Sequence, residues 1–169
     1  AAHFPTDSSG DYAKKAIAAF QAKLAAAPAT YDRVTLTPFA PPAQVELAPA
    51  GTADLVVTFR NVHNWLQGAG EQAVFKAAFA ALKPGGVFGV VEHRAKPGTS
   101  REQSLDSGYT AEQLVIDGAT AAGFVLEEKS EINANPKDTK DYAKGVWTLP
   151  PSYAEGDKDK AKYQAIGES

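Results

Sequence analysis

The chain has 169 residues, of which 44% are hydrophobic and 22% are charged, a composition typical of a globular domain large enough to bury a hydrophobic core. The formal net charge of −3 provides no basic field for binding nucleic acid, and no apolar run approaches the length of a membrane span. The chain contains no cysteine, which excludes disulfides and thiolate metal ligands. With three histidines, any metal site would depend largely on carboxylates.

The chain also contains no methionine, not even at its first position. We therefore expect that processing or truncation removed the original start. Residues 1–10 contain no positively charged stretch followed by an apolar run, which is the pattern of an export signal. The absence of cysteine is compatible with export and is also common in cytoplasmic proteins, so the compartment stays open.

The first third of the chain predicts a helix between two short extended segments. Residues 1–5 are expected to end an extended segment, and the polar residues 6–11 to cap the start of a helix. From Tyr12 onward, apolar residues recur at spacings of three and four and predict one helical face that ends at Pro28; they are Ala13, Ala16, Ile17, Phe20 and Leu24. Residues 34–37 resemble a short strand closed by Pro38, and a proline-rich loop follows to Pro49.

The centre of the chain predicts a strand, a helix and a second strand. Ala53–Phe59 and residues 86–91 are near-continuous apolar runs, as in strands that are buried on both faces. Between them, a stripe of apolar residues predicts a helix that ends at Pro84-Gly85-Gly86; the stripe consists of Val74, Phe75, Ala78, Phe79 and Leu82. This order is typical of a βαβ crossover in a parallel sheet.

The last third of the chain is less regular. Thr110 and Gln113 form a capping-box pattern, which predicts a helix that ends at Gly123. We expect a strand to begin at residues 124–126, a loop at 132–144 and an extended segment at 145–149. The alternating charges of residues 155–162 are typical of a solvated face or a frayed tail. No boundary is visible, so residues 1–169 are predicted to form a single α/β domain.

Two polar clusters follow the two central strands, at the edge of a parallel sheet where ligands bind. The first is Arg60-Asn61-Val62-His63-Asn64-Trp65, and the second is Glu92-His93-Arg94. Because the carboxyl ends of parallel strands lie at one edge, we expect both clusters, with two of the three histidines, at the same edge. This coincidence is the main evidence in the residues themselves for a functional site.

Each residue of these clusters also has a structural interpretation. Arg60 and Glu92 are candidates either for a salt bridge between neighbouring strand ends or for ligand contacts. Asn61 and Asn64 can cap the turn by bonding to backbone groups, as asparagine often does after a strand. Trp65 can pack in the interior or serve as a stacking platform.

The histidines leave two kinds of site open. They can be buried structural residues, or acids and bases near neutral pH. A metal site would combine His63, His93 and Glu92, with His3 at the end of an adjacent strand, although no tight spacing motif is present. No Gly-x-Ser-x-Gly turn of a serine hydrolase follows any strand. Lys83-Pro84-Gly85-Gly86 precedes a strand, so it is interpreted as a helix stop and not as a phosphate loop.

Several segments resemble a known family. Residues 53–57 (Ala-Asp-Leu-Val-Val) and 82–88 (Leu-Lys-Pro-Gly-Gly-Val-Phe) look like the fourth and fifth strands of class I S-adenosylmethionine-dependent methyltransferases. More narrowly, the chain resembles a bacterial group of predicted, largely uncharacterised methyltransferases at residues 58–65 (Thr-Phe-Arg-Asn-Val-His-Asn-Trp), 92–95 (Glu-His-Arg-Ala) and 135–138 (Asn-Pro-Lys-Asp). The resemblance covers most of the chain, and the Phe-Arg-Asn-Val-His-Asn-Trp string is its most specific part.

The resemblance implies a Rossmann-like methyltransferase sheet, mostly parallel with an antiparallel C-terminal edge, and incomplete at both termini. In the family, a Gly-rich turn after the first strand lets the backbone approach the methionine moiety of the cofactor, and this chain has no such turn. The chain would then start near the end of the second strand, around Ala2 and His3. The last strand of the family would begin near residues 166–169.

The resemblance also implies site residues. It assigns the residues just after the fourth strand to the pocket of S-adenosylmethionine: Phe59, Arg60 and Asn61. The residues that follow would face the methyl group of the cofactor or the substrate: His63, Asn64 and Trp65. The acidic ribose ligand of the family would fall near Ala2 or His3. At the place of its acidic adenine contact the chain has Thr37-Pro38-Phe39, where Phe39 offers an apolar surface.

The function implied by the resemblance is S-adenosylmethionine-dependent methyl transfer to a small-molecule acceptor. Displacement at a sulfonium carbon needs a positioned nucleophile and sometimes a base. His63 or His93 is the candidate base, and Glu92 would orient an imidazole. The alternatives are a non-catalytic binding or interaction domain on the same fold and, as a third option, a metal-dependent enzyme.

The expected partners follow from these assignments. A small-molecule substrate is expected, with no nucleic acid and no membrane span. A sheet without its first strand would expose unpaired edges, so we also expect a homo-oligomer or association with the missing N-terminal portion. The cytoplasm is the default compartment because the cofactor is cytoplasmic, and export stays open.

Overall fold

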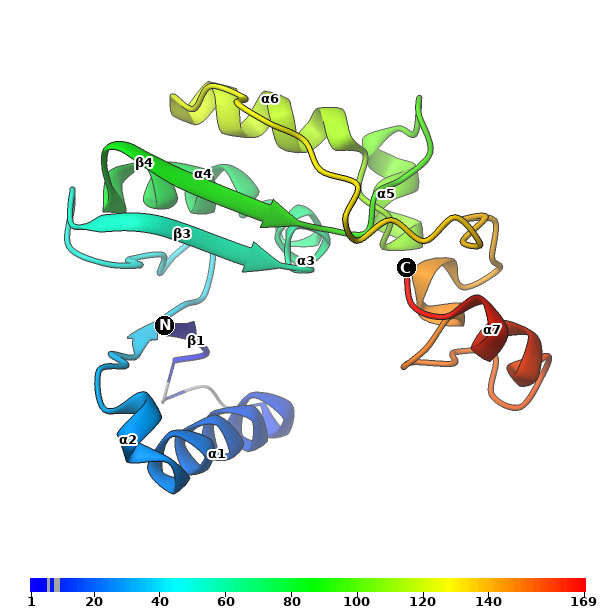
Figure 1. The fold of residues 1–169 in the computed structure, drawn as a ribbon, viewed down its shortest axis with the longest axis horizontal. Helices are drawn as coiled ribbons and strands as arrows, with labels where there is room; N and C mark the ends of the chain where they lie inside the picture. Colours follow the sequence, from blue (N-terminus) through cyan, green and yellow to red (C-terminus); the bar gives the residue numbers. More distant parts are fainter. Residues whose placement is uncertain (6, 8–9) are drawn as a thin grey trace. The chain divides into compact units, whose positions relative to one another are not determined.

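The computed structural model describes residues 1–5, 7 and 10–169 and shows a mixed α/β chain with two separate two-stranded sheets (Figure 1). The chain divides into two compact units. The N-terminal unit comprises Ala1–Val56 and Ala73–Phe88, and the C-terminal unit comprises Val57–Gln72 and Gly89–Ser169. The predicted α/β class is confirmed.

The N-terminal unit begins with a small parallel sheet. β1 (Ala2–His3) pairs with β2 (Thr37–Pro38), which confirms the extended N-terminus and places the second strand at the end of the predicted range 34–37. The backbone N–H groups of Thr37 and Phe39 donate to Ala1 and His3, so Pro38, which has no N–H, lies between the two bonds and weakens neither.

The predicted first helix is confirmed as α1 (Asp11–Ala26). Pro28 follows it and starts the short helix α2 (Pro28–Tyr31), where a proline in the first turn loses no hydrogen bond. The N-cap of α1 is Gly10, and no side chain caps this end. Of the polar residues expected to cap the helix, three lie outside the described residues: Thr6, Ser8 and Ser9.

The central elements confirm the predicted crossover. β3 (Ala53–Phe59) is followed by α3 (Val62–Gln67), α4 (Glu71–Ala81) and β4 (Leu82–Val91), and β3 and β4 pair in parallel. α4 ends at Ala81 and β4 begins at Leu82, so Pro84-Gly85-Gly86 lies within the strand and the prediction that it ends the helix is wrong. A Cβ atom at Gly86 would lie 3.0 Å from the Lys83 carbonyl oxygen and 3.2 Å from the Asp54 carbonyl oxygen, so the backbone leaves little room for a side chain there.

All residues of the predicted apolar stripe are buried except Phe79. Val74, Phe75 and Ala78 are buried, and the Phe75 ring packs edge-on against Phe88 at 6.0 Å between ring centroids. Burying a phenylalanine side chain of this kind stabilises a fold by roughly 1.5–3 kcal/mol. Phe79 is exposed, so the buried stripe is narrower than the sequence predicts.

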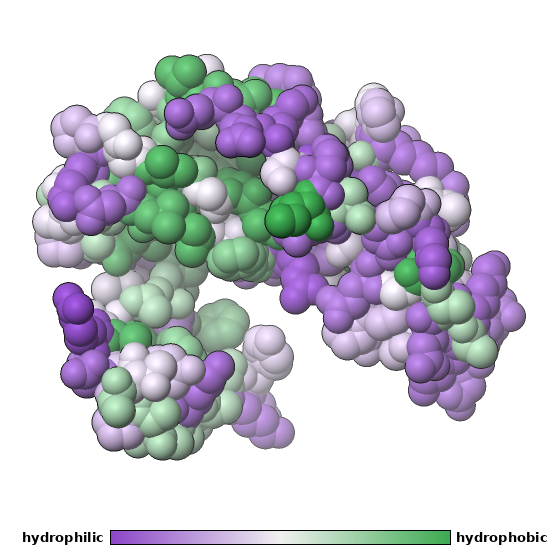
Figure 2. Space-filling model, viewed as in Figure 1, coloured by the Kyte–Doolittle hydropathy of each residue, from purple (hydrophilic) through white to green (hydrophobic). Residues whose placement is uncertain are grey.

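The prediction that β3 is buried on both faces is wrong. The side chains of Leu55, Val57 and Phe59 are 58%, 51% and 60% exposed. The sheet contains no third strand within the described residues, so the outward-pointing side chains of β3 have few neighbours. Figure 2 shows apolar surface, in green, that faces solvent in this view.

The C-terminal unit is mainly helical after β4. Its helices are α5 (Arg101–Ser107), α6 (Glu112–Ala122), the 3-10 helix η1 (Gly145–Thr148) and α7 (Lys160–Ile166). Its core joins loops and helices that lie far apart in the sequence, at Ala95, Tyr109, Ala111 and Val146. None of the helices in the described part of the chain is long and apolar enough to cross a membrane.

The helix caps of this unit differ from the prediction. The capping box forms at Ser100 and Gln103, at the start of α5, which the sequence did not predict. α6 has Ala111 at its N-cap and no side-chain cap, so the expected box at Thr110 and Gln113 does not form. The predicted end at Gly123 is confirmed, since this residue has a left-handed conformation that glycine adopts without strain.

Two extended segments predicted in this unit are also wrong. Residues 124–131 have no regular secondary structure, and after β4 the described chain contains no strand, so the predicted antiparallel edge is absent from the described residues. A strand needs a neighbour for its backbone groups, and no strand pairs with this segment. Residues 145–148 form η1 instead of an extended segment because Gly145 has a φ of 56° and lies against the Ser107 backbone.

Candidate functional site

The centre of the candidate site is a hydrogen-bonded pair of two buried side chains of the C-terminal unit. His63 lies in the first turn of α3, directly after β3, and Glu92 directly follows β4. The Nδ1 atom of His63 lies 2.9 Å from Oε1 of Glu92, and the two side chains are 4% and 7% exposed. The structure therefore brings together one residue from each of the two polar clusters.

Glu92 is held as a charged carboxylate. Burial alone would raise its pKa, but the hydrogen bond and charge of His63 and the bonds from the backbone lower the pKa below its ordinary value. Its Oε1 accepts the N–H of His93 at 2.8 Å and its Oε2 accepts the N–H of His63 at 3.3 Å. With these bonds the carboxylate is fixed in one orientation and serves as a rigid partner for the His63 ring.

His93 is the second buried imidazole of the site. Its ring centroid lies 5.8 Å from that of His63 and 6.5 Å from that of Tyr109, and its Nδ1 atom is buried without a hydrogen-bond partner in the described residues. Burial lowers the pKa of His93, and the charges of His63 and Arg60 lower it further, against the opposing effects of Glu92 and Ser169. We therefore expect His93 to be neutral at pH 7.

Three residues that the sequence did not single out as site residues complete the surroundings. The Trp147 ring, from η1, packs edge-on against His63 at 5.2 Å between centroids. The hydroxyl of Tyr109 donates to the carboxylate of Asp138 at 2.9 Å and 3.1 Å. Burial and Asp138 raise the pKa of Tyr109, so its hydroxyl stays protonated. Asp138 ends one of the segments that resemble the methyltransferases, whereas no sequence signal marks Tyr109.

Arg60 does not pair with Glu92, so the salt bridge, which is one of two interpretations of these residues, does not form. Its guanidinium Nη1 donates to Oε2 of Glu168 at 2.8 Å, and both side chains are about half exposed. The Arg60 backbone has a φ of 57° and its N–H donates to Val91 at 2.7 Å. This turn after β3 directs Arg60 away from Glu92, which leaves the carboxylate to His63.

Asn61 and Trp65 behave mainly as structural residues, whereas Asn64 lies at the surface. The Asn61 side chain donates to Thr58 Oγ1 at 3.3 Å and to the Phe59 carbonyl at 3.1 Å, which confirms its role in bonding the turn. Asn64 is exposed on α3. Trp65 is buried, so it packs in the interior and its ring is not open for stacking.

The remaining predicted residues lie in different places. Phe59 is exposed at the end of β3, whereas Phe39 and His3 belong to the N-terminal unit, where the Phe39 N–H donates to the His3 carbonyl at 2.7 Å. Within the residues that the structure describes, no group of three or more His, Cys, Asp or Glu side chains could hold a metal ion.

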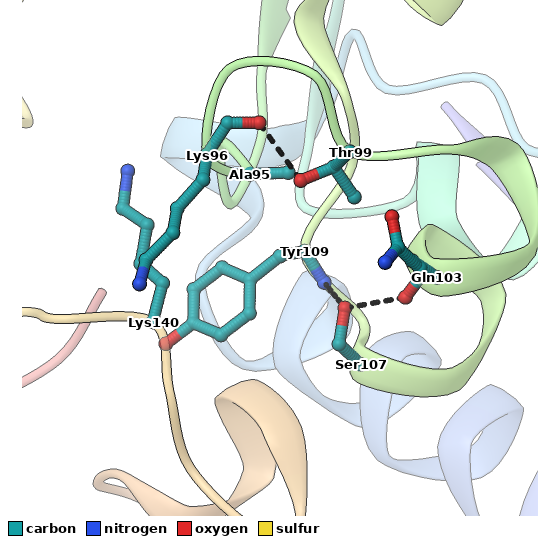
Figure 3. Close-up of a pocket in the computed structure, with 7 residues that line it drawn as sticks. All are labelled: Ala95, Lys96, Thr99, Gln103, Ser107, Tyr109 and Lys140. Atoms are coloured by element: carbon teal, nitrogen blue, oxygen red, sulfur yellow. Dashed lines mark hydrogen bonds between the residues drawn. The ribbon is translucent and has the colours of Figure 1, made fainter.

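The C-terminal unit also contains a cavity of about 220 Å³ (Figure 3). Its lining includes Lys96, Tyr109 and Lys140, and none of the predicted site residues. The volume lies below the usual range of pockets for drug-sized ligands, about 300–1,000 Å³. The cavity is therefore a separate feature that the sequence did not predict.

Comparison of the chain with protein-family models, with curated proteins and with solved structures found no match in any of the three. The function therefore has to be argued from the site and from the residues around it.

Proposed function

We propose that this chain belongs to an S-adenosylmethionine-dependent methyltransferase with a Rossmann-like sheet, and that it transfers a methyl group to a small-molecule acceptor. The observation that supports this function best is the buried His63–Glu92 pair at the carboxyl ends of two parallel strands. Ligands of open α/β sheets bind at this edge. The residues that resemble the family, Phe59 to Trp65 and the segment from Leu82, belong to the same two strands and their ends.

His63 would act as the general base on the acceptor. Its Nδ1 faces the Glu92 carboxylate, so this nitrogen holds the proton of the neutral ring and Nε2 remains to accept a proton. The carboxylate fixes the ring and stabilises the imidazolium that forms. His93, whose pKa is lowered by burial, is the second candidate base.

The residues after β3 fit the amino-acid end of the cofactor. Arg60 binds the carboxylate of Glu168 at 2.8 Å, which demonstrates that a carboxylate can reach this guanidinium. The carboxylate of S-adenosylmethionine would take its place, Asn61 would add an amide, and the exposed ring of Phe59 would offer apolar surface. The cofactor supplies an electrophilic methyl group on a sulfonium. Because the chain has no Gly-rich turn, these residues would make only part of the contacts.

Calorimetric titration of this chain with S-adenosylmethionine tests the proposal. We expect saturable binding, and we expect Arg60→Gln to weaken it about tenfold or more through loss of a charge-assisted pair. Arg33→Gln is the matched control, because Arg33 is exposed and belongs to the N-terminal unit. Absence of saturable binding by the folded protein would contradict cofactor-dependent methyl transfer by this chain.

The exposed apolar side chains of β3 favour a second candidate, a non-catalytic interaction domain. Leu55, Val57 and Phe59 present an apolar strand to solvent, which is typical of surfaces that bind other proteins. In that case neither the unsubstituted chain nor the Arg60→Gln variant would bind S-adenosylmethionine. The titration above therefore separates the two candidates.

A further inference from the structure

The cavity of the C-terminal unit is lined by cationic and neutral polar side chains. Figure 3 shows Lys96 and Lys140 on one side of the Tyr109 ring, and Thr99, Gln103 and Ser107 on the other. Among the described residues that line the cavity there is no Asp or Glu. The two neighbouring carboxylates are already bonded, Asp138 to the Tyr109 hydroxyl and Asp141 to the Lys96 ammonium. The lining itself therefore presents two ammonium groups and neutral polar groups, which favour an anion.

The two lysines differ in what they already bind. The Lys96 ammonium pairs with Asp141, an exposed residue outside the cavity lining. No hydrogen bond or ion pair of the Lys140 ammonium is present within the described part of the chain. The Lys140 charge acts on Glu131, an exposed residue outside the lining, without forming an ion pair with it. Lys140 can therefore bind an anion directly, and Lys96 can do so when Asp141 is displaced.

The walls of the cavity are held in place by hydrogen bonds. Asp138 accepts both the Tyr109 hydroxyl and, at 3.0 Å, the backbone N–H of Lys140. Lys140 has a φ of 59°, a conformation that is strained for a residue with a side chain and that this bond helps to maintain. The Thr99 hydroxyl donates to the Lys96 carbonyl at 2.8 Å, which fixes the opposite loop.

We propose that this cavity binds a small oxyanion, the carboxylate or phosphate group of a small ligand, between Lys96 and Lys140. The volume of about 220 Å³ admits such a group but not a ligand of the size of S-adenosylmethionine. This site is independent of the proposed methyl transfer, because none of its lining residues belongs to the His63–Glu92 pair.

Backbone amide NMR of the whole chain tests this site, with sodium phosphate and sodium acetate titrated in parallel and sodium chloride at equal ionic strength as the reference. We expect saturable shifts at Thr99 and Lys140 with at least one oxyanion and none with chloride. The oxyanion that binds with the lower Kd shows whether the site prefers a phosphate or a carboxylate group. Shifts that do not saturate, or that chloride reproduces, would overturn the proposal.

Lysine variants locate the binding. Lys140→Gln is expected to weaken it about tenfold or more, and Lys140→Arg to retain it, which separates loss of charge from loss of folding. Lys144→Gln is the matched control, because Lys144 is exposed four residues away and does not line the cavity. Equal effects of Lys140→Gln and Lys144→Gln would overturn the proposal.

Asp141→Asn tests the second lysine. Removing this carboxylate frees the Lys96 ammonium, so we expect oxyanion binding to become several-fold tighter. Unchanged or weaker binding in this variant would overturn the placement of the anion between the two lysines.

Discussion

At the scale of single residues, the His63–Glu92 pair is the feature with the clearest chemical consequence. A buried carboxylate that bonds an imidazole fixes both the orientation of the ring and the nitrogen that carries its proton. The pair also couples function to stability, because removing one partner leaves the other buried and unpaired. Such a loss costs about 3–5 kcal/mol when the remaining group keeps its charge.

Substitution of His63 tests its role as a base. If the chain transfers methyl groups, His63→Ala should lower turnover by about 10²–10⁴-fold, the usual contribution of a general base, while cofactor binding remains. Turnover and calorimetry should be measured on the same preparation. Gln67→Ala on the exposed side of α3 is the control and should leave both unchanged. Full activity in His63→Ala would remove His63 from this role.

In the proposed reaction Glu92 would act through His63, so we expect its substitution to affect turnover differently. Glu92→Gln keeps the shape of the side chain but removes the charge that stabilises the imidazolium. We expect a smaller loss of turnover, about 10–100-fold, that appears in kcat and not in KM. A loss that appears only in KM or in the free energy of unfolding would indicate a purely structural role for Glu92.

His93 predicts a pH dependence of folding stability. In the unfolded chain a histidine binds its proton near its ordinary pKa of 6.5, whereas burial lowers the pKa of folded His93. Below pH 6.5 the unfolded state therefore binds more protons than the folded state, and stability falls as the pH falls, by at most about 1.4 kcal/mol per pH unit. The lowered pKa of Glu92 acts in the same direction below its ordinary value of 4.5.

Denaturant unfolding of His93→Phe at pH 7.5, 6.5 and 5.5 measures this contribution. Phenylalanine keeps an aromatic ring between His63 and Tyr109 but cannot bind a proton. We expect the free energy of unfolding of the variant to change less between pH 6.5 and 5.5 than that of the unsubstituted chain. Parallel pH profiles of the two proteins would show that His93 does not titrate differently in the folded state.

At the scale of elements, the helix caps illustrate where local patterns fail. The sequence places a capping box at Thr110, but the Thr110 N–H donates to the His93 carbonyl at 2.7 Å and its carbonyl accepts the Ala95 N–H at 2.9 Å. This bridge between distant segments holds Thr110 away from the cap of α6. The box at Ser100 has no such competitor and forms.

Removal of the two candidate caps should therefore have unequal effects. Ser100→Ala removes the hydroxyl that accepts the Gln103 N–H at 3.2 Å and should cost about 1 kcal/mol, or about 2–4 °C in Tm. Gln113→Ala removes the residue expected to complete the other box. Its Tm should change much less, because within the described residues the Gln113 side chain bonds only to Asp117, at the surface. Equal shifts in thermal unfolding would contradict this assignment of the caps.

Two glycines with positive φ provide a matched test of the turn into η1. An alanine Cβ at Gly145 would lie 2.0 Å from the Ser107 carbonyl oxygen, whereas at Gly156 it would meet nothing within 4 Å. Gly156→Ala should cost about 1–2 kcal/mol from the backbone conformation alone. Gly145→Ala should cost clearly more in denaturant unfolding, since Ser107 must also move. Similar losses of unfolding free energy in the two variants would mean that the positive φ of Gly145, and not its contact with Ser107, determines the cost of the substitution.

The same contrast between local and distant interactions sets what could be predicted of the fold and the site. β3 was predicted to the residue because a continuous apolar run between turn residues is a local signal. The strand expected at residues 124–126 did not form because it depends on a neighbour. Likewise, strand order placed His63 near Glu92, but the pairing of Arg60 with Glu168, 108 residues away, has no local signal.

At the scale of the whole molecule, the unpaired edge and the exposed side chains of β3 are expected to influence self-association. Edge strands with exposed apolar side chains and free backbone groups can pair with another chain, and the described sheet has β3 at an edge. Val125 is also exposed, but it lies in an irregular segment whose backbone groups are not arranged for strand pairing. The geometry of the strand, and not exposure alone, should therefore decide how strongly the protein associates.

Val57→Lys and Val125→Lys separate these two causes, because both valines are exposed and only Val57 lies in a strand. In sedimentation velocity over a range of concentrations, we expect self-association by the unsubstituted chain that Val57→Lys weakens by tenfold or more, about 1.4 kcal/mol. Val125→Lys should weaken it much less. Neither substitution should lower Tm by more than about 2 °C, because each replaces a side chain already in contact with water. If both variants weaken self-association equally, non-specific hydrophobic contact and not strand pairing is responsible for the association.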